Sequence, residues 1–252
     1  MSLRFIAPLI AAIAMLAPAL ASAEPVAGPL PPTGGSPLAL TALLAGMALL
    51  PFALILVTSF VKVAVVLSIL RTAIGAQQVP PNTVITGLAI LLSIYIMAPV
   101  GHDIFTELRP HIDAYEAGEL QVNFSSMEEA GQAGAAPLRA FLMRHADPED
   151  RLLLHELAIE LRPPEQHKNV AAEDLLVVVP AFVITELKEA FTIGFILFVP
   201  FIIVDLVVAN ILLSLGMHML SPTTVSLPFK LLLFVLVDGW YLVVKGLILG
   251  YV

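Results

Sequence analysis

The sequence predicts an all-α membrane protein with about four long hydrophobic helices and one small polar helical segment. Two features of the composition carry this prediction: 59% of the 252 residues are apolar and only 13% are charged, whereas soluble domains carry about 25% charged residues. The third observation is the length of the apolar runs, several of which approach the roughly 20 residues that a membrane-spanning helix needs. A mean hydropathy of +0.96 agrees with this class.

Residues 1–23 have the pattern of a secretory signal peptide. Arg4 supplies the positive charge, an apolar run follows, and the small residues 21–23 form the cleavage site. An uncleaved membrane anchor is the alternative, which the shortness of the apolar run and the prolines in it disfavour. Residues 24–36 are rich in proline and glycine, and we expect them to form a disordered linker.

An N-terminal hydrophobic hairpin is predicted over residues 37–100. Its first span, 37–58, contains Pro51, which should kink or break the helix. Its second span, 83–100, should end at Pro99.

The segment 59–82 between these two spans keeps the helical spacing of apolar residues, but Lys62 and Arg71 interrupt it. Gly75 and the prolines at 80–81 should end this helix. Lysine and arginine collect on the cytoplasmic side of inserted segments, so we expect this connection to face the cytoplasm.

Residues 101–172 form a long polar segment with thirteen acidic residues against six lysines and arginines. A long acidic loop without a basic excess is expected on the periplasmic side. Two amphipathic helices are predicted within it, over 137–145 and 148–161, and Asp147 should cap the second. Residues 131–136, rich in glycine and alanine, should form a flexible approach to them.

C-terminal hydrophobic hairpins are predicted over residues 173–252. The apolar run 175–184 is too short to span and contains a proline, so it should pack on protein or re-enter the membrane. The third and fourth spans are expected over 190–215 and 227–250, joined by a loop from Gly216 to Ser226. Periodicity leaves a four-span and a five-span count open.

Ionisable residues in or beside the last apolar runs are candidate functional residues, because charges at membrane depth are costly unless they face protein or water. They are Glu186, Lys188, Glu189, Asp205, Lys230 and Asp238. We predict that Lys230 pairs with an acid of this set, in the same chain or in a neighbouring copy. Lys188 is expected to be solvated near the membrane surface. Asp205, Asp238 and Asn210 are expected to be buried polar groups that pack between helices.

Several classes of function are disfavoured. Without cysteine there is no disulfide, thiolate nucleophile or cysteine-based metal site, and a net charge of −8 argues against nucleic-acid binding. Met217 and Met219 flank His218, but a Cu(I) site would need further ligands in that loop. The sequence contains no phosphate-binding glycine loop or serine–histidine–aspartate grouping, so we expect no enzymatic activity, no cofactor and no metal.

Five segments carry a resemblance to a known family, among them PAFVITELKEAF at 180–191. The others are residues 58–82, 94–100, 137–145 and 205–240. In order and content these segments resemble the FliP/SctR family, core export-gate proteins of the flagellar and virulence type III secretion systems. The resemblance implies a pore-forming subunit that passes unfolded proteins across the bacterial inner membrane. It also implies that the helices form bent hairpins and assemble into a helical multi-subunit gate, with much of the complex toward the periplasm.

The resemblance further implies partners. They are further copies of the chain in a pentamer-like set, FliQ/SctS-like and FliR/SctT-like subunits, FlhA/SctV-like and FlhB/SctU-like export-gate proteins, unfolded secreted proteins and membrane lipid. The QVPP motif at 78–81, Lys62 and the Ser221–Pro222 pair resemble the virulence branch. A signal peptide is more usual in flagellar members, and the virulence branch is favoured on balance.

Site residues follow from the same resemblance. The loop that bears Met217 and Met219 would be a gasket that closes the pore around the exported chain. His218 stands where flagellar members usually carry a middle methionine. The family's charge contact between its ELK and SLPFK segments would join Glu186 and Lys230.

A proton- or solute-coupled membrane carrier is the alternative function. Carriers are often built from internal repeats with broken helices in matching positions, and no such symmetry relates residues 37–100 to residues 175–250. A passive membrane anchor for residues 101–172 would leave the charges between 186 and 238 unexplained. The export-gate subunit is therefore the preferred interpretation.

Overall fold

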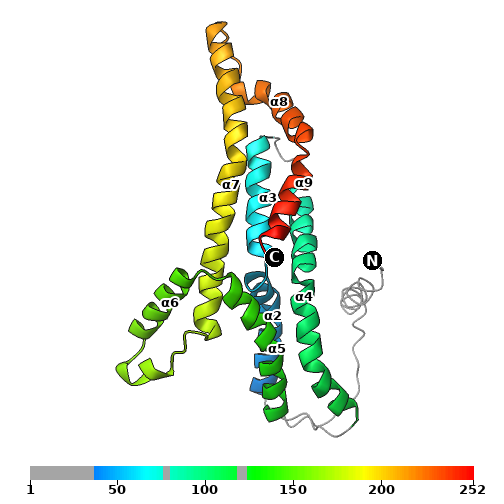
Figure 1. Ribbon diagram of the computed structural model, residues 1–252, viewed down its shortest axis with the longest axis vertical. Coiled ribbons are helices and arrows are strands. Elements are labelled where there is room, and N and C mark those ends of the chain that lie inside the picture. Colours follow the sequence, from blue (N-terminus) through cyan, green and yellow to red (C-terminus); the bar gives the residue numbers. More distant parts are fainter. Residues whose placement is uncertain (1–36, 76–79, 118–123) are drawn as a thin grey trace. The chain divides into compact units, whose positions relative to one another are not determined.

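Helices are the only regular secondary structure in the computed structural model, within the residues that it describes, 37–75, 80–117 and 124–252 (Figure 1). This agrees with the predicted all-α class. The predicted signal peptide and linker, residues 1–36, lie outside the described ranges.

Two units emerge from the contacts within the chain, Met1–Ala48 and Leu49–Val252. Helix α2 (Pro37–Leu56) crosses the boundary between them and continues through Pro51, where the sequence predicts a kink or a break. The second unit holds the remaining helices and is described below by itself.

Helix α3 (Phe60–Ile74) is shorter than the predicted segment 59–82 and ends at Gly75, as the sequence predicts. Gly75 has a φ of 76°, a left-handed conformation that glycine adopts without steric cost. One face of α3 is buried against α4, α7 and α8, and it contains Val63, Val66 and Leu70. With 15 residues, α3 falls short of the roughly 20 needed to span a membrane.

Helix α4 (Asn82–Glu116) runs for 35 residues and passes through both Pro99 and Pro110, so the predicted end at Pro99 is wrong. Each proline removes one backbone hydrogen bond, but packing elsewhere holds the helix. Its first half contributes Ala89 and Leu92 to the core beside α3.

Helix α5 (Phe124–His145) begins well before the predicted 137–145 and includes residues 131–136, so the predicted flexible approach is wrong. Helix α6 (Pro148–Glu160) matches its prediction. Asp147 caps it by accepting a hydrogen bond from the N–H of Glu149 at 2.7 Å. A 3-10 helix, η3 (Pro164–Asn169), follows.

Helix α7 (Leu175–Ser214) is the element against which α3, α5, α6 and α8 all pack (Figure 1). It is one helix of 40 residues that continues through Pro180 and Pro200. The predicted separation of a short piece over 175–184 from a span over 190–215 is therefore wrong. At Gly194 an added Cβ would lie 2.4 Å from a side-chain carbon of Ile69, so α3 and α7 approach too closely there for any larger residue.

The predicted fourth span over 227–250 is two helices, α8 (Pro222–Leu236) and α9 (Gly239–Leu249), which meet at a bend of 60°. Asp238, between them, has a φ of 50°. An added Cβ on Gly239 would lie 2.2 Å from the ring of Phe234, so the bend requires glycine there.

Two helices of the described residues, α4 and α7, are long and apolar enough to cross a membrane, and α8 with α9 would make a third if the bent pair is one span. The first predicted span, 37–58, corresponds to α2, an apolar helix of 20 residues, so the predicted count of about four long hydrophobic helices is met when α8 and α9 are taken as one bent pair.

Candidate functional site

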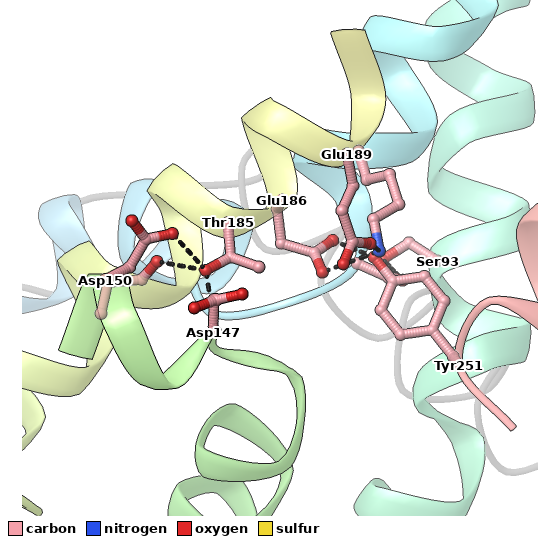
Figure 2. A network of polar contacts seen from close by, with 10 residues as sticks. Ser93, Asp147, Asp150, Thr185, Glu186, Glu189 and Tyr251 are labelled. Carbon is pink, nitrogen blue, oxygen red and sulfur yellow. Dashed lines mark hydrogen bonds and ion pairs between the residues drawn. The ribbon is translucent and has the colours of Figure 1, made fainter. Parts of the chain in front are cut away.

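Polar side chains of α7 meet partners from other helices at three levels, and these levels contain five of the six ionisable candidate residues predicted from the sequence. Thr185 and Lys188 meet α6, Glu186 and Glu189 meet α3 and the residues after α9, and Asp205 meets α8. Figure 2 shows the first two levels, where Thr185 lies toward Asp150 and Asp147 while Glu186 lies toward Tyr251.

Lys62 of α3 is 2% exposed and lies between two carboxylates of α7. Its Nζ is 2.6 Å from Oε2 of Glu189 and 2.9 Å from Oε1 of Glu186. The contact with Glu186 is an ion pair that lacks the geometry of a hydrogen bond. Glu186 is fully buried, whereas the side chain of Glu189 is 51% exposed. The two acids are three residues apart and so share one face of α7, and their shared partner is Lys62.

Tyr251 closes this cluster from the C-terminal side. Its hydroxyl donates to Oε2 of Glu186, and the Nζ of Lys62 lies 4.2 Å from the centre of its ring (Figure 2). Burial, followed by the charge of Glu186, raises the pKa of Tyr251, so the phenol stays protonated and remains a donor. The ring stacks on Phe141 and tilts against His145.

The first level, with Thr185 and Lys188, joins α6 to α7. Asp150 is 3% exposed, and its Oδ2 accepts a hydrogen bond from the hydroxyl of Thr185 at 3.0 Å. The same hydroxyl oxygen accepts from the N–H of Asp147 at 2.9 Å. Lys188 pairs with the other oxygen of Asp150, with 64% of its side chain exposed. Lys188 is thus largely solvated, as predicted, and it also neutralises a buried carboxylate.

The third level surrounds Lys230 of α8, which is 4% exposed. Its Nζ is 2.6 Å from Oδ2 of Asp205 and donates to the carbonyl of Ala73, in the last turn of α3, at 3.3 Å. The hydroxyl of Ser226 donates to the other oxygen of Asp205. One lysine therefore fastens α8, α7 and the C-terminal end of α3, and the prediction that Lys230 pairs with an acid of the named set holds within one chain.

The pairing of Glu186 with Lys230 is not formed within the chain. Glu186 and Asp205 are 205 − 186 = 19 residues apart on α7, which is about 28 Å at 1.5 Å per residue. Because Lys230 lies against Asp205, it cannot reach Glu186, which is held by Lys62. A contact between Glu186 and Lys230 of neighbouring copies stays a prediction.

The predicted packing groups divide in two. Asp205 is partly buried and is an ion-pair partner rather than a neutral packing group. Asp238 and Asn210 are exposed in the single chain, so the expectation that they are buried is wrong within one copy.

Met217, His218 and Met219 occupy the turn between α7 and α8, which runs over Leu215–Ser221 and is shorter than the predicted loop because α8 begins at Pro222. The N–H of Met217 donates to the carbonyl of Leu212 at 2.9 Å, and Gly216, with a φ of 74°, donates to Leu213 at 3.1 Å. These two bonds form a Schellman motif, which fixes the path of the chain out of the helix.

Both methionine side chains point away from the chain that carries them. Met219 is 98% exposed and Met217 is 47% exposed, and His218 is exposed as well. The turn is therefore an apolar tip on a defined backbone, available for contact with something outside this chain.

The chemistry that these groups support is structural. Each buried charge is matched by an opposite charge or a hydrogen bond, and no group of three histidine or acidic side chains able to hold a metal occurs in the described residues. Sequence reasoning missed Lys62 as a partner, because a basic residue beside an apolar run also marks the cytoplasmic side. It missed Asp150 because that residue lies in the polar segment, where charges are common, and Tyr251 because a tyrosine at the end of an apolar run carries no charge that calls for a partner.

Comparison with known proteins identifies relatives over most of the chain. A model of the FliP family matches residues 43–247. The chain is 45% identical to Yop proteins translocation protein R of Yersinia pestis over 206 residues, 81% of this chain and 92% of the relative. It is 42% identical over 205 residues to the hypersensitivity response secretion protein HrcR of Ralstonia nicotianae, covering 81% and 93% of the two chains. It is 43% identical over 222 residues to the flagellar biosynthetic protein FliP of Bacillus subtilis, covering 88% and 95%.

Proposed function

The chain belongs to the FliP family, and from that membership we propose that it is a core subunit of a type III protein export apparatus, where it helps to form the pore for unfolded substrates. The observation that carries the proposal is the extent of the match, since the relatives named for translocation, secretion and flagellar biosynthesis align over 92%, 93% and 95% of their own lengths. The long apolar helices α4 and α7 support a place in a membrane, and we assign it to the bacterial inner membrane.

The role is that of a structural subunit without enzymatic activity. The buried charges of the described residues join helices to one another, and the exposed apolar side chains on the long helices are available to contact other subunits. We propose that these are further copies of the chain and the FliQ/SctS-like and FliR/SctT-like subunits, with FlhA/SctV-like and FlhB/SctU-like proteins acting beside them. The QVPP motif at 78–81 and the Ser221–Pro222 pair resemble the virulence branch, and we place the chain in that branch.

The turn that bears Met217, His218 and Met219 is proposed as the gasket of the pore. Methionine is flexible and polarisable, so it can seal against exported chains of varied sequence. The Schellman motif at Gly216 supports this role, because a seal needs soft side chains on a backbone that holds its position.

Gene deletion tests the main proposal. Loss of the gene should abolish type III export while solute uptake continues, and a plasmid copy should restore export. Loss of solute uptake with export intact would instead favour a proton- or solute-coupled carrier.

The gasket is tested by the double substitution Met217→Ala and Met219→Ala, which removes both thioethers and keeps the turn. In the assembled gate we expect a rise in ion leak, measured as conductance across a planar bilayer. Leu220→Ala is the matched control, because Leu220 lies in the same turn and is 47% exposed. Conductance equal to wild type in the double variant would remove the sealing role.

A further inference from the structure

Helix α6 presents an unpartnered face made of two parallel rows of side chains. One row is apolar and the other is acidic, and every member of both is exposed: Leu153, Leu157 and Leu161 at 50%, 42% and 86%, beside Glu149, Glu156 and Glu160. Leucines four residues apart lie one above another on a helix. The face therefore forms a short apolar stripe with a negative border.

The buried side of α6, which adjoins the leucine row, is held firmly, so the orientation of the two rows is fixed. Asp150 bonds to Thr185 of α7, and Leu154 packs into the core around Phe182. His155 contacts the carbonyl of Val170 at 3.1 Å. In Figure 1, α6 stands beside α7 with its other side open.

Lipid does not account for this stripe. Helix α6 belongs to the polar part of the chain and is not one of the two helices long and apolar enough to cross a membrane, α4 and α7. Helices that lie on membrane surfaces carry lysine and arginine on their polar side. A row of glutamates would instead be repelled by anionic headgroups.

The two acids nearest the C-terminal end of the row are also a local cost to α6 itself, whereas Glu149 lies in the first turn, where the helix dipole favours an acid. Glu156 and Glu160 are like charges at i and i+4, and Glu160 lies in the last turn, where the helix dipole disfavours an anion. Helix stability therefore gives no reason for these acids. A partner that brings positive charge would remove both penalties, whereas a second copy of the same face would double them.

We infer that the Leu153–Leu157–Leu161 stripe with its glutamate border is a docking site for a basic amphipathic helix of another protein, one with an apolar stripe flanked by lysine or arginine. Helix-in-groove and helix-on-helix recognition uses such i, i+4 anchors. Charge complementarity sets the partner's sign and the binding orientation. The inference concerns a surface of the folded chain and goes beyond the proposed export role.

The direct test uses the full chain in detergent and a fluorescent 18-residue helical peptide with a leucine stripe flanked by lysines. The matched peptide has glutamate in place of each lysine. Fluorescence anisotropy should show binding of the lysine peptide only. Leu157→Ser and the pair Glu156→Lys with Glu160→Lys should each weaken that binding at least tenfold, while Leu176→Ser, at another exposed leucine, should not. Equal binding of both peptides, or no effect of the pair, would overturn the inference.

Two other occupants are separated by further measurements. If Leu157→Ser alone converts a self-associated form of the chain to a smaller one in sedimentation velocity, the face joins copies of the chain and the inference fails. If a polarity-sensitive dye on Leu157→Cys shifts to the blue on reconstitution into zwitterionic vesicles, the face lies in lipid and the inference fails again.

Cells provide the functional arm. Once gene deletion has been shown to abolish export, the chain with Glu156→Lys and Glu160→Lys should reach wild-type levels yet export at least fivefold less substrate. Wild-type export by that variant would overturn this inference and leave the proposed export function standing.

Discussion

Lys62 and Lys230 are both buried against α7, at opposite ends of α3, but different groups neutralise them. Lys62 lies in the first turn of α3, where the helix dipole disfavours a cation, and two carboxylates and a phenol ring surround it. Lys230 points at the last turn of α3, where a backbone carbonyl accepts from it, and one carboxylate, Asp205, suffices. In this chain, a buried lysine at the N-terminal end of α3 is neutralised by two carboxylates, and one at the C-terminal end is neutralised by a single carboxylate. The comparison teaches that the helix end beside a buried lysine affects how many acids are required to neutralise it.

The largest expected effect is that of Lys62→Met, which leaves Glu186 fully buried without its cation. Stranding one charge of a buried pair typically costs about 3–5 kcal/mol. Thermal unfolding of the purified chain in detergent should show the loss. Lys245→Met, at an exposed lysine, is the control, and an equal midpoint for the two variants would contradict the importance of this site.

Lys230→Met should cost less, about 1–3 kcal/mol. Asp205 is 29% exposed, so water can replace the ammonium there, and only the buried carbonyl of Ala73 loses its donor. The same unfolding assay measures the difference between the two lysine sites. If Lys230→Met destabilises the chain more than Lys62→Met, the proposed role of the helix ends is wrong.

Removing one acid from each site sharpens the comparison further. Glu189→Gln should cost less than about 1 kcal/mol, because half-exposed ion pairs contribute little and Glu186 remains beside Lys62. Asp205→Asn removes the single carboxylate at Lys230, so it should cost more than Glu189→Gln. Urea unfolding midpoints of Glu189→Gln and Asp205→Asn give the ratio of the two losses of stability. This ratio tests whether the single acid at Lys230 matters more than the second acid at Lys62.

The smallest effect concerns His145, which packs on Tyr251 beside the Lys62 site. Burial, then the positive charge of Lys62, lowers the pKa of His145 from its ordinary value of 6.5, while Glu189 raises it slightly. The folded chain thus binds the proton less well than the unfolded chain, so stability is full above pH 6.5 and falls as the pH drops below it. In the His145→Phe variant the unfolding midpoint should depend less on pH between pH 7 and pH 5. If the midpoint changes with pH as steeply as in the wild type, His145 is not the source of the pH dependence.

Local signals in the sequence predict the ends of several helices correctly. Gly75 ends α3, Asp147 caps α6 and Gly216 ends α7, because each acts through its own backbone or side-chain geometry. Pro99 and Pro180 mislead, since a proline imposes a local cost that packing along a long helix can outweigh.

Partners of buried charges were harder to predict than helix ends. The apolar surroundings of Glu186, Asp205 and Lys230 in the sequence identify them as groups that need partners. Which residue pairs with each of them depends on which other helices pack beside that part of α7. The pairing of Lys62 with Glu186 joins residues 186 − 62 = 124 positions apart, and no periodicity in the sequence reports on such a distance.

The length of α7 bears on how the chain survives before assembly. Its 40 residues extend for about 60 Å at 1.5 Å per residue, twice the roughly 30 Å of hydrocarbon in a bilayer. Even a tilt of about 40°, the upper end of the usual range, would leave some 46 Å along the membrane normal. Part of this apolar helix must therefore lie outside the lipid. In a chain that has not assembled with its partners, that part would be exposed to proteases. The cellular lifetime of the chain should depend on the supply of its partners.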